Sequence, residues 1–111
     1  MTVKELKEAL DLTVYSGEEG LNNDISGGYT SDLLSDVMGH AQEGQVWVTL
    51  QTHKNVMAIA SLKDLAAVIL VKGFKPEDDM AAQSNLEGIP VLGTTKQAFE
   101  ITGEIYKRLQ K

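Results

Sequence analysis

Apolar positions along this chain change repeatedly between a helical spacing of three to four residues and short continuous runs. Helical spacing recurs in five segments, each with a capping or helix-starting residue in front of it. Thr2-x-x-Glu5 has the pattern of a capping box, and so does Thr94-x-x-Gln97. The expected helices begin at Val3, after Thr30 or Ser31, at Asn55, at Pro76 and after Thr94, and they end near Leu10, Ala41, Leu62, Gly88 and Leu109.

Two of these helices have a clear apolar face. The expected face of the second helix consists of Leu33, Leu34, Val37, Met38 and Ala41, and the expected stripe of the last helix consists of Ala98, Thr102, Ile105, Tyr106 and Leu109. Gly103 lies inside the last helix and suggests that this helix packs closely against a neighbour.

Short apolar runs between the helices predict strands. They lie at Leu12–Tyr15, from Ile25 into Gly27-Gly28, and at Val46–Leu50, Ala66–Val71 and Ile89–Leu92. After residue 24 strands and helices alternate with short connections, which is typical of parallel strands joined by right-handed crossovers. We therefore expect an α/β fold with three layers, in which a mostly parallel sheet of about five to six short strands has helices on both faces.

Ligands of open parallel sheets bind beyond the carboxyl ends of the strands. This rule selects the connections at 27–31, 51–55, 72–75 and 93–95. The candidate ligand-binding residues in and beside them are Gln51, Thr52, His53, Asn55, Gly28, Tyr29, Ser31, Lys72, Gly73 and Thr94.

The segment Gly27-Gly28-Tyr29-Thr30-Ser31-Asp32 can be interpreted in two ways. A glycine turn before a helix N-terminus can bind an anion, but Asp32 in the first helical turn would already supply negative charge, so a simple turn and cap is favoured. Asp32, Asp36 and His40 share one helix face, which we interpret as a solvated face and not as a metal site.

The polar stretch from Thr49 to Asn55 is the main candidate site. Thr52 or His53 can cap the following helix with a side-chain oxygen or with the backbone. Capping does not require Gln51, His53 and Asn55 all together, so these side chains either contact a ligand or satisfy buried polar groups. No catalytic residue is predicted, because the sequence has no nucleophile elbow, phosphate loop or acid pair. Lys72 beside Gly73 could counter a phosphate or simply end a strand.

Composition narrows the functional classes. A chain of 111 residues is expected to form one domain over 1–111, and its net charge of −6 argues against binding nucleic acid through the phosphate backbone. It has no cysteine, no leader-like N-terminus and no apolar run of membrane-spanning length, so a cytoplasmic protein without membrane attachment is expected. No cofactor is implied.

Four segments of the sequence resemble a known family. They are GGYTSDLLSDVMG, VWVTLQTHKNVMAIA, AAVILVKG and GIPVLGTT, and they are similar to the DRTGG-domain family in its small stand-alone form. The N-terminal stretch TVKELKEALDLTVYSGEEGLNNDI also resembles the N-terminal domain of HPr kinase/phosphorylase, whose kinase domain has no counterpart here. The family's Asp-Arg aligns with Thr52-His53 and its Thr-Gly-Gly with Val71-Lys72-Gly73, so Gly73 alone is kept.

The resemblance implies a regulatory or dimer-forming module. Our first hypothesis is therefore a non-catalytic sensor that binds a small anionic metabolite or nucleotide at the carboxyl ends of the strands, as a homodimer and beside a partner enzyme. A homodimeric interaction module without a ligand is the alternative, and a small hydrolase with His53 as base is a third.

Overall fold

The computed structural model describes residues 1–110 of the chain. Its elements in order are α1 (Val3–Leu10), β1 (Thr13–Ser16), the short 3₁₀ helix η1 (Glu18–Gly20), β2 (Gly27–Thr30), α2 (Leu34–His40), β3 (Gln45–Thr49), α3 (Asn55–Leu62), β4 (Ala67–Leu70), α4 (Asp78–Glu87), β5 (Val91–Gly93) and α5 (Ala98–Leu109).

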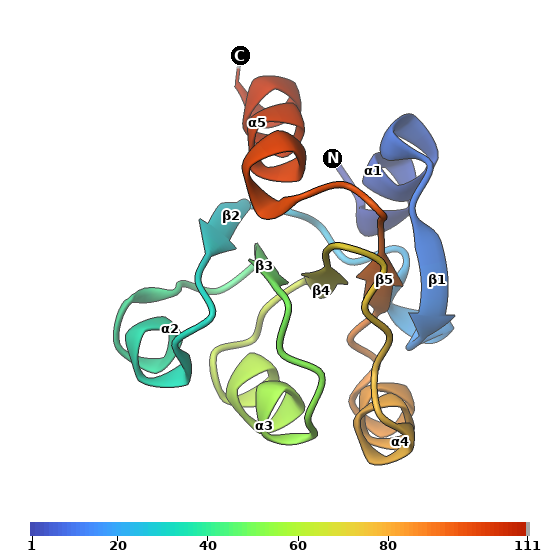
Figure 1. The fold of residues 1–111 in the computed structure, drawn as a ribbon, viewed down its shortest axis with the longest axis vertical. Coiled ribbons are helices and arrows are strands. Elements are labelled where there is room, and N and C mark those ends of the chain that lie inside the picture. Colours follow the sequence, from blue (N-terminus) through green and yellow to red (C-terminus); the bar gives the residue numbers. More distant parts are fainter. Residues whose placement is uncertain (111) are drawn as a thin grey trace.

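The strands form one sheet in the order β1-β5-β4-β3-β2. Strands β2 to β5 run parallel to one another, and β1 pairs antiparallel with β5. Helices α2, α3 and α4 cover one face of this sheet, while α1 and α5 cover the other (Figure 1). The predicted fold class, a mostly parallel α/β sheet with helices on both faces, is therefore confirmed, and β1 and β2 are the two edge strands.

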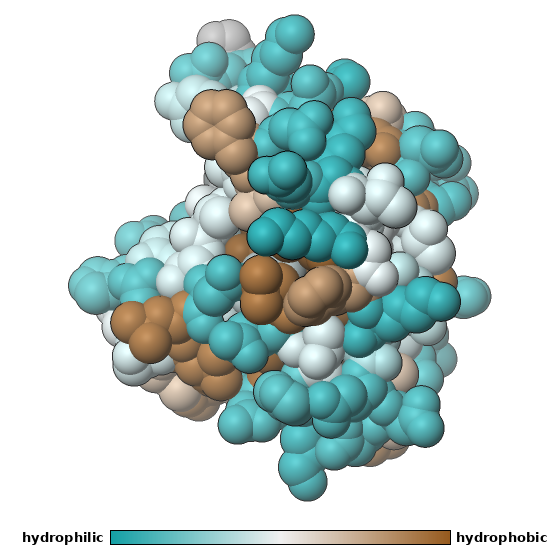
Figure 2. Space-filling model, viewed as in Figure 1, coloured by the Kyte–Doolittle hydropathy of each residue, from teal (hydrophilic) through white to brown (hydrophobic). Residues whose placement is uncertain are grey.

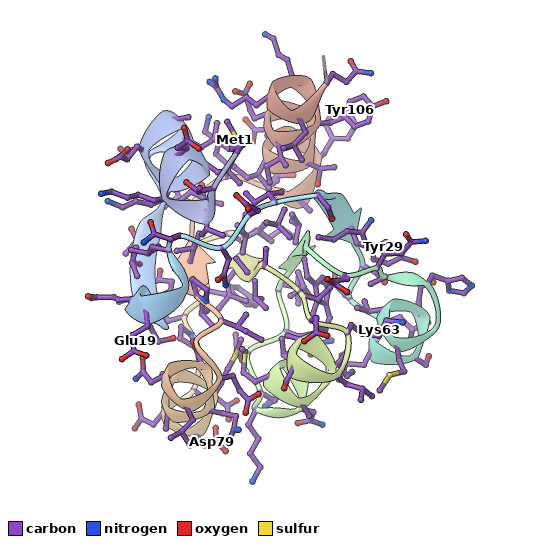
Figure 3. The ribbon with its side chains drawn as sticks, turned by 180° about the vertical axis from the view of Figure 1, so that it is seen from behind. Met1, Glu19, Tyr29, Lys63, Asp79 and Tyr106 are labelled. Carbon is purple, nitrogen blue, oxygen red and sulfur yellow. The ribbon has the colours of Figure 1, made fainter. Side chains whose placement is uncertain are left out.

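The sheet separates two apolar clusters whose side chains fill the space under each helix layer (Figure 3). Strand residues alternate between them: Val46 and Val48 face α1 and α5, while Trp47 faces α2 to α4. All four residues of β4 are buried, because this strand has a neighbour on each side and helices above and below.

Several predicted helix boundaries are confirmed to the residue. At α1 the amide of Thr2 donates to the Glu5 carboxylate at 2.8 Å, and the amide of Glu5 donates to the Thr2 hydroxyl at 3.2 Å, which completes the capping box. Helix α3 covers Asn55–Leu62 as expected. Gly88 ends α4 with a left-handed φ of 66°, a conformation that glycine adopts without the steric penalty of a side chain.

The glycine pair was expected at the end of a strand and also in a turn before α2, and the structure places it in the strand. Gly27 and Gly28 belong to strand β2 and pair with Gln45 and Val46 of β3, so they do not form a turn. Helix α2 begins at Leu34, and neither Thr30 nor Ser31 caps it, although the Ser31 hydroxyl accepts from the Leu33 amide at 3.2 Å. The pairing with a fully buried strand outweighs the weak strand preference of glycine.

Helix faces and starts also differ in detail from the prediction. In α5 the fully buried residues are Ile101 and Ile105, whereas Tyr106 is 64% exposed and Gly103 has open space around it. In α2 and its two flanking residues, Val37 and Ala41 are buried, but Leu33 and Met38 are exposed. Pro76 lies two residues before α4, and the residues that cap α4 and α5 are Glu77 and Gln97.

Within residues 1–110, no helix combines the length and the hydrophobicity that a membrane span requires.

Candidate functional site

The predicted site lies on four connections that follow the parallel strands. They cover residues 31–33, 50–54, 71–77 and 94–97, and we call them the carboxyl-end loops. Because β2, β3, β4 and β5 are parallel neighbours, these loops emerge side by side, and Figure 1 views the molecule from their side. The sequence-based expectation that the candidates share one end of the sheet therefore holds for the loop residues.

Asp32 is the centre of a hydrogen-bond network that fixes the loop after β3. Its carboxylate accepts from the Thr49 hydroxyl at 2.8 Å and from the Leu50 amide at 2.9 Å. The side-chain amide of Gln51 donates to the Asp32 carbonyl at 3.0 Å. Because α2 begins at Leu34, Asp32 precedes this helix and does not lie in its first turn, contrary to the prediction. The side chain of Gln51 is held by another part of the protein.

His53 links this loop to the next one. Its Nδ1 lies 2.8 Å from Oε2 of Glu77, and the Glu77 amide donates to the Thr52 carbonyl at 3.0 Å. Both side chains are more than half exposed, at 61% and 51%, so the contact contributes little to stability. Neither Thr52 nor His53 caps α3 with its side chain, but the His53 carbonyl accepts from the Val56 amide at 3.0 Å, which is the backbone form of the predicted capping.

Asn55 does not join Gln51 and His53. It is the first residue of α3 and lines a hollow of about 520 Å³ against α4, together with Met57, Gln83 and Glu87. The three polar side chains singled out in the sequence therefore have three separate roles and do not converge on one point.

Lys72 and Gly73 form a tight turn after β4, with left-handed φ values of 59° and 74°. Their amides donate to the carbonyls of Lys96 and Thr94, each at 2.9 Å, and tie this turn to the loop after β5. The Thr94 hydroxyl in turn accepts from the Lys96 amide at 3.2 Å. These backbone N–H groups are engaged within the protein, so an anion at this place has to be bound by side chains.

Cationic side chains are concentrated on the carboxyl-end loops. Lys54, Lys72, Lys75 and Lys96 are exposed there, while the acidic residues of the same loops are Asp32 and Glu77, which contact Thr49 and His53. The loops are therefore net positive in a chain of net charge −6. Figure 2 shows this side of the molecule, where hydrophilic groups surround an exposed apolar area, and Phe74 of the loop after β4 is 43% exposed.

Three of the predicted candidates lie on β2 or next to it and are separated from the lysines. Gly28 faces α5, whereas Tyr29 points to the opposite side of the sheet and donates from its hydroxyl to Asp36 at 2.9 Å. The carbonyl of Ser31 accepts from the indole Nε1 of Trp47 at 2.8 Å. Tyr29 thus joins β2 to α2, and Ser31 joins the end of β2 to β3.

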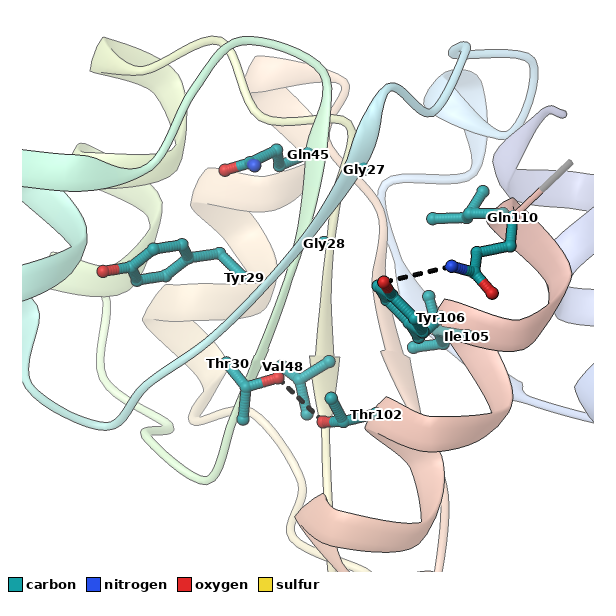
Figure 4. A pocket seen from close by; sticks show the side chains of 11 residues that line it. Gly27, Gly28, Tyr29, Thr30, Gln45, Val48, Thr102, Ile105, Tyr106 and Gln110 are labelled. Atoms are coloured by element: carbon teal, nitrogen blue, oxygen red, sulfur yellow. Dashed lines mark hydrogen bonds between the residues drawn. The ribbon is translucent and has the colours of Figure 1, made fainter.

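A cavity that the sequence analysis missed lies between β2 and α5. Its volume is about 470 Å³, and its floor includes Gly28, Val48 and Ile105 (Figure 4). Another hollow, of about 520 Å³ and separate from the one beside Asn55, lies beside the loop after β5 and is lined by polar groups that include Thr94, Lys96 and Arg108. The sequence feature that corresponds to the first cavity is Gly28, which leaves space opposite α5 and which was also expected to belong to a turn.

The Tyr29–Asp36 contact predicts a measurable pKa change. The pKa of the Tyr29 phenol is raised above its ordinary value of 10.0, first by desolvation of the phenolate and then by its hydrogen bond to Asp36. We expect Asp36→Asn to lower this pKa, because the negative charge that disfavours the phenolate is removed. Absorbance titration of tyrosinate measures it, and Tyr29→Phe identifies the Tyr29 contribution.

The sign of the associated stability change follows from linkage. Because the pKa is higher in the folded state than in the unfolded state, the contribution of Tyr29 is fully present below pH 10.0 and is lost as the pH rises through the folded-state value. An Asp36→Asn variant with an unchanged Tyr29 titration would contradict this assignment.

Comparisons with known proteins give one informative result. No family model matches the sequence, and no curated protein matches it. The fold is similar to the crystal structure of the CBS and DRTGG domains of the regulatory region of Clostridium perfringens pyrophosphatase, complexed with the activator diadenosine tetraphosphate. The TM-score is 0.71 at 12% sequence identity, over 95% of this chain and 46% of that one. The chain thus spans about half the length of the structure that it matches, and at this identity the likeness shows a shared fold.

Proposed function

We propose that this chain is a regulatory module of the DRTGG type that binds a small anionic metabolite or nucleotide at the carboxyl-end loops and carries out no catalysis itself. The observation that carries the proposal is the cluster of Lys54, Lys72, Lys75 and Lys96 on loops that are fixed by hydrogen bonds to one another. A homodimer and a partner enzyme, both implied by the family resemblance, stay predictions.

The positive charge of the carboxyl-end loops contrasts with the negative net charge of the chain. An acidic protein repels anions at long range, so four exposed lysines on loops whose own two carboxylates contact Thr49 and His53 mark the place where an anion is least disfavoured. Lysine carries a compact charge on a flexible stem and binds phosphate oxygens without a fixed geometry. The loops beneath are ordered by the Asp32 network and by the Lys72–Gly73 turn, so little ordering of the backbone is needed when a ligand binds.

A nucleotide fits this surface better than a bare phosphate. Phe74 is 43% exposed within the same loop as Lys72 and Lys75 and offers an aromatic face for stacking beside two cations. The fold similarity supports this choice, because the regulatory region that shares the fold forms a complex with a dinucleoside polyphosphate as its activator.

The proposal is tested by thermal unfolding in the presence of pyrophosphate, AMP, ADP, ATP and diadenosine tetraphosphate. A ligand at ten times its Kd stabilises the folded state by ~1.4 kcal/mol, which raises the Tm of a domain of this size by about 5 °C or more. We expect such a rise for at least one polyphosphate and its loss in the double variant Lys72→Gln/Lys96→Gln.

The matched control is Lys4→Gln/Lys107→Gln, which removes the same charge from exposed positions on α1 and α5. This control should keep the ligand-induced rise in Tm. An equal loss in both double variants would mean that net charge alone matters, and no rise with any of these compounds would contradict the proposed function.

A further inference from the structure

The cavity between β2 and α5 lies apart from the carboxyl-end lysines. It follows the open edge of the sheet, because β2 is the last strand and pairs on one side with β3. Helix α5 crosses above this edge and forms the opposite wall (Figure 4). The cavity is therefore an accessible concave site of about 470 Å³, within the size range of small-molecule pockets.

The walls of the cavity are uncharged. Val48, Ile105 and Leu109 form an apolar surface, and within residues 1–110 no aspartate, glutamate, lysine, arginine or histidine lines the cavity. Polar groups occur at its two ends: the Tyr106 hydroxyl, which accepts from the Gln110 side-chain amide at 3.1 Å, and the hydroxyls of Thr30 and Thr102, 2.7 Å apart.

Gly28 keeps the cavity open. A Cβ atom at this position would point toward the cavity and lie 3.6 Å from Val46 Cγ2 and 3.8 Å from Ile105 Cγ2, which are ordinary contact distances. A side chain is thus sterically allowed at position 28 and would occupy the space that the glycine leaves free. Val46 and Ile105 are buried beneath it at 0% and 3% exposure.

We propose that this cavity binds a neutral, largely apolar small molecule that carries hydrogen-bonding groups toward its ends. An anion or a cation would lose its hydration without meeting a charged partner, whereas an uncharged ligand would bury apolar surface against Val48 and Ile105. The Tyr106 hydroxyl and the hydroxyls of Thr30 and Thr102 are placed to orient it. This site is independent of the anion site proposed above.

The test uses two dyes with the same ring skeleton. N-phenyl-1-naphthylamine is neutral and fluoresces when it enters an apolar site, and 8-anilinonaphthalene-1-sulfonate adds one negative charge. With the dye at fixed concentration and the protein titrated, we expect the neutral dye to bind with a Kd on the order of 0.1 mM, as for about 17 non-hydrogen atoms bound with ordinary ligand efficiency. The sulfonate should bind this cavity at least ~10-fold more weakly.

Two variants fill the cavity from opposite walls. Gly28→Val and Thr102→Leu should each weaken the neutral dye at least ~10-fold while the protein remains folded by circular dichroism. Thr13→Val is the matched control, because it places an exposed β-branched side chain in β1, at the other edge of the sheet, and should leave binding unchanged.

Three results of the dye titrations would overturn the proposal. They are the absence of saturable binding of the neutral dye, binding that both filled variants retain, and a sulfonate that binds as tightly as the neutral dye and is equally sensitive to Gly28→Val. A dimer in size-exclusion chromatography that excludes the dye and is abolished by Gly28→Val would also overturn it, by showing that a second copy occupies the cavity.

Discussion

Replacing Trp47 with alanine is expected to lower the free energy of unfolding by about 3–5 kcal/mol, which is a large part of the 5–15 kcal/mol typical of a small domain. Trp47 is fully buried in β3, between β2 and β4, and it is the largest of the fully buried side chains. The variant leaves a cavity in the cluster beneath α2 to α4 and also removes the hydrogen bond from the indole to the Ser31 carbonyl.

Denaturant unfolding followed by circular dichroism measures this loss, since Trp47 is the single tryptophan and its fluorescence disappears with it. Trp47→Phe keeps most of the buried ring and should lose clearly less stability. Phe99→Ala is the exposed counterpart, because Phe99 is 90% exposed and its removal should change stability by no more than ~0.5 kcal/mol. A Trp47→Ala variant within about 1 kcal/mol of the wild type would refute the packing assigned to β3.

The second large effect is expected for Asp32→Ala, at about 1–3 kcal/mol. The substitution leaves the Thr49 hydroxyl, which belongs to a residue only 1% exposed, and the Leu50 amide without their acceptor. An unpaired polar group in a buried position loses its hydrogen bond to water without a replacement. The loop after β3 also loses two of its three hydrogen bonds to Asp32 and keeps only the one from Gln51 to the backbone carbonyl.

Hydrogen exchange of the Leu50 amide measures this effect at the site, and denaturant unfolding measures it for the whole domain. Asp32→Asn retains an acceptor oxygen and should recover much of the loss. If Asp32→Ala matches the wild type in both measurements, Asp32 does not organise the carboxyl-end loops.

The fold was predictable where local patterns and tertiary packing agree. The Thr2–Glu5 capping box and helix α3 were predicted to the residue, because their signals are short-range. Gly27 and Gly28 were expected to end a strand and to form a turn, because an isolated glycine pair favours a turn, and the pairing with β3 keeps them in the strand. In α5 the buried positions include Ile101 instead of Thr102, because the orientation of a helix is set by what it packs against and not by its own spacing.

The placement of the candidate loops at one end of the sheet was predictable, but the hydrogen-bond partners of their side chains were not. The carboxyl-end rule placed Gln51, His53, Lys72 and Thr94 on neighbouring loops, which the parallel sheet confirms. The sequence did not show that Gln51 contacts the Asp32 carbonyl or that His53 contacts Glu77, because these partners are 19 and 24 residues away along the chain. Polar groups that look free for a ligand were instead used to hold the loops together.

An NMR titration of the ¹⁵N-labelled protein with ATP tests the central claim most directly, because it shows where an anion binds. We expect saturable amide shift changes concentrated in residues 50–54, 71–77 and 94–97, which become weaker as the salt concentration is raised. Shift changes that saturate on another surface, or none at millimolar ATP, would contradict an anion site on the carboxyl-end loops.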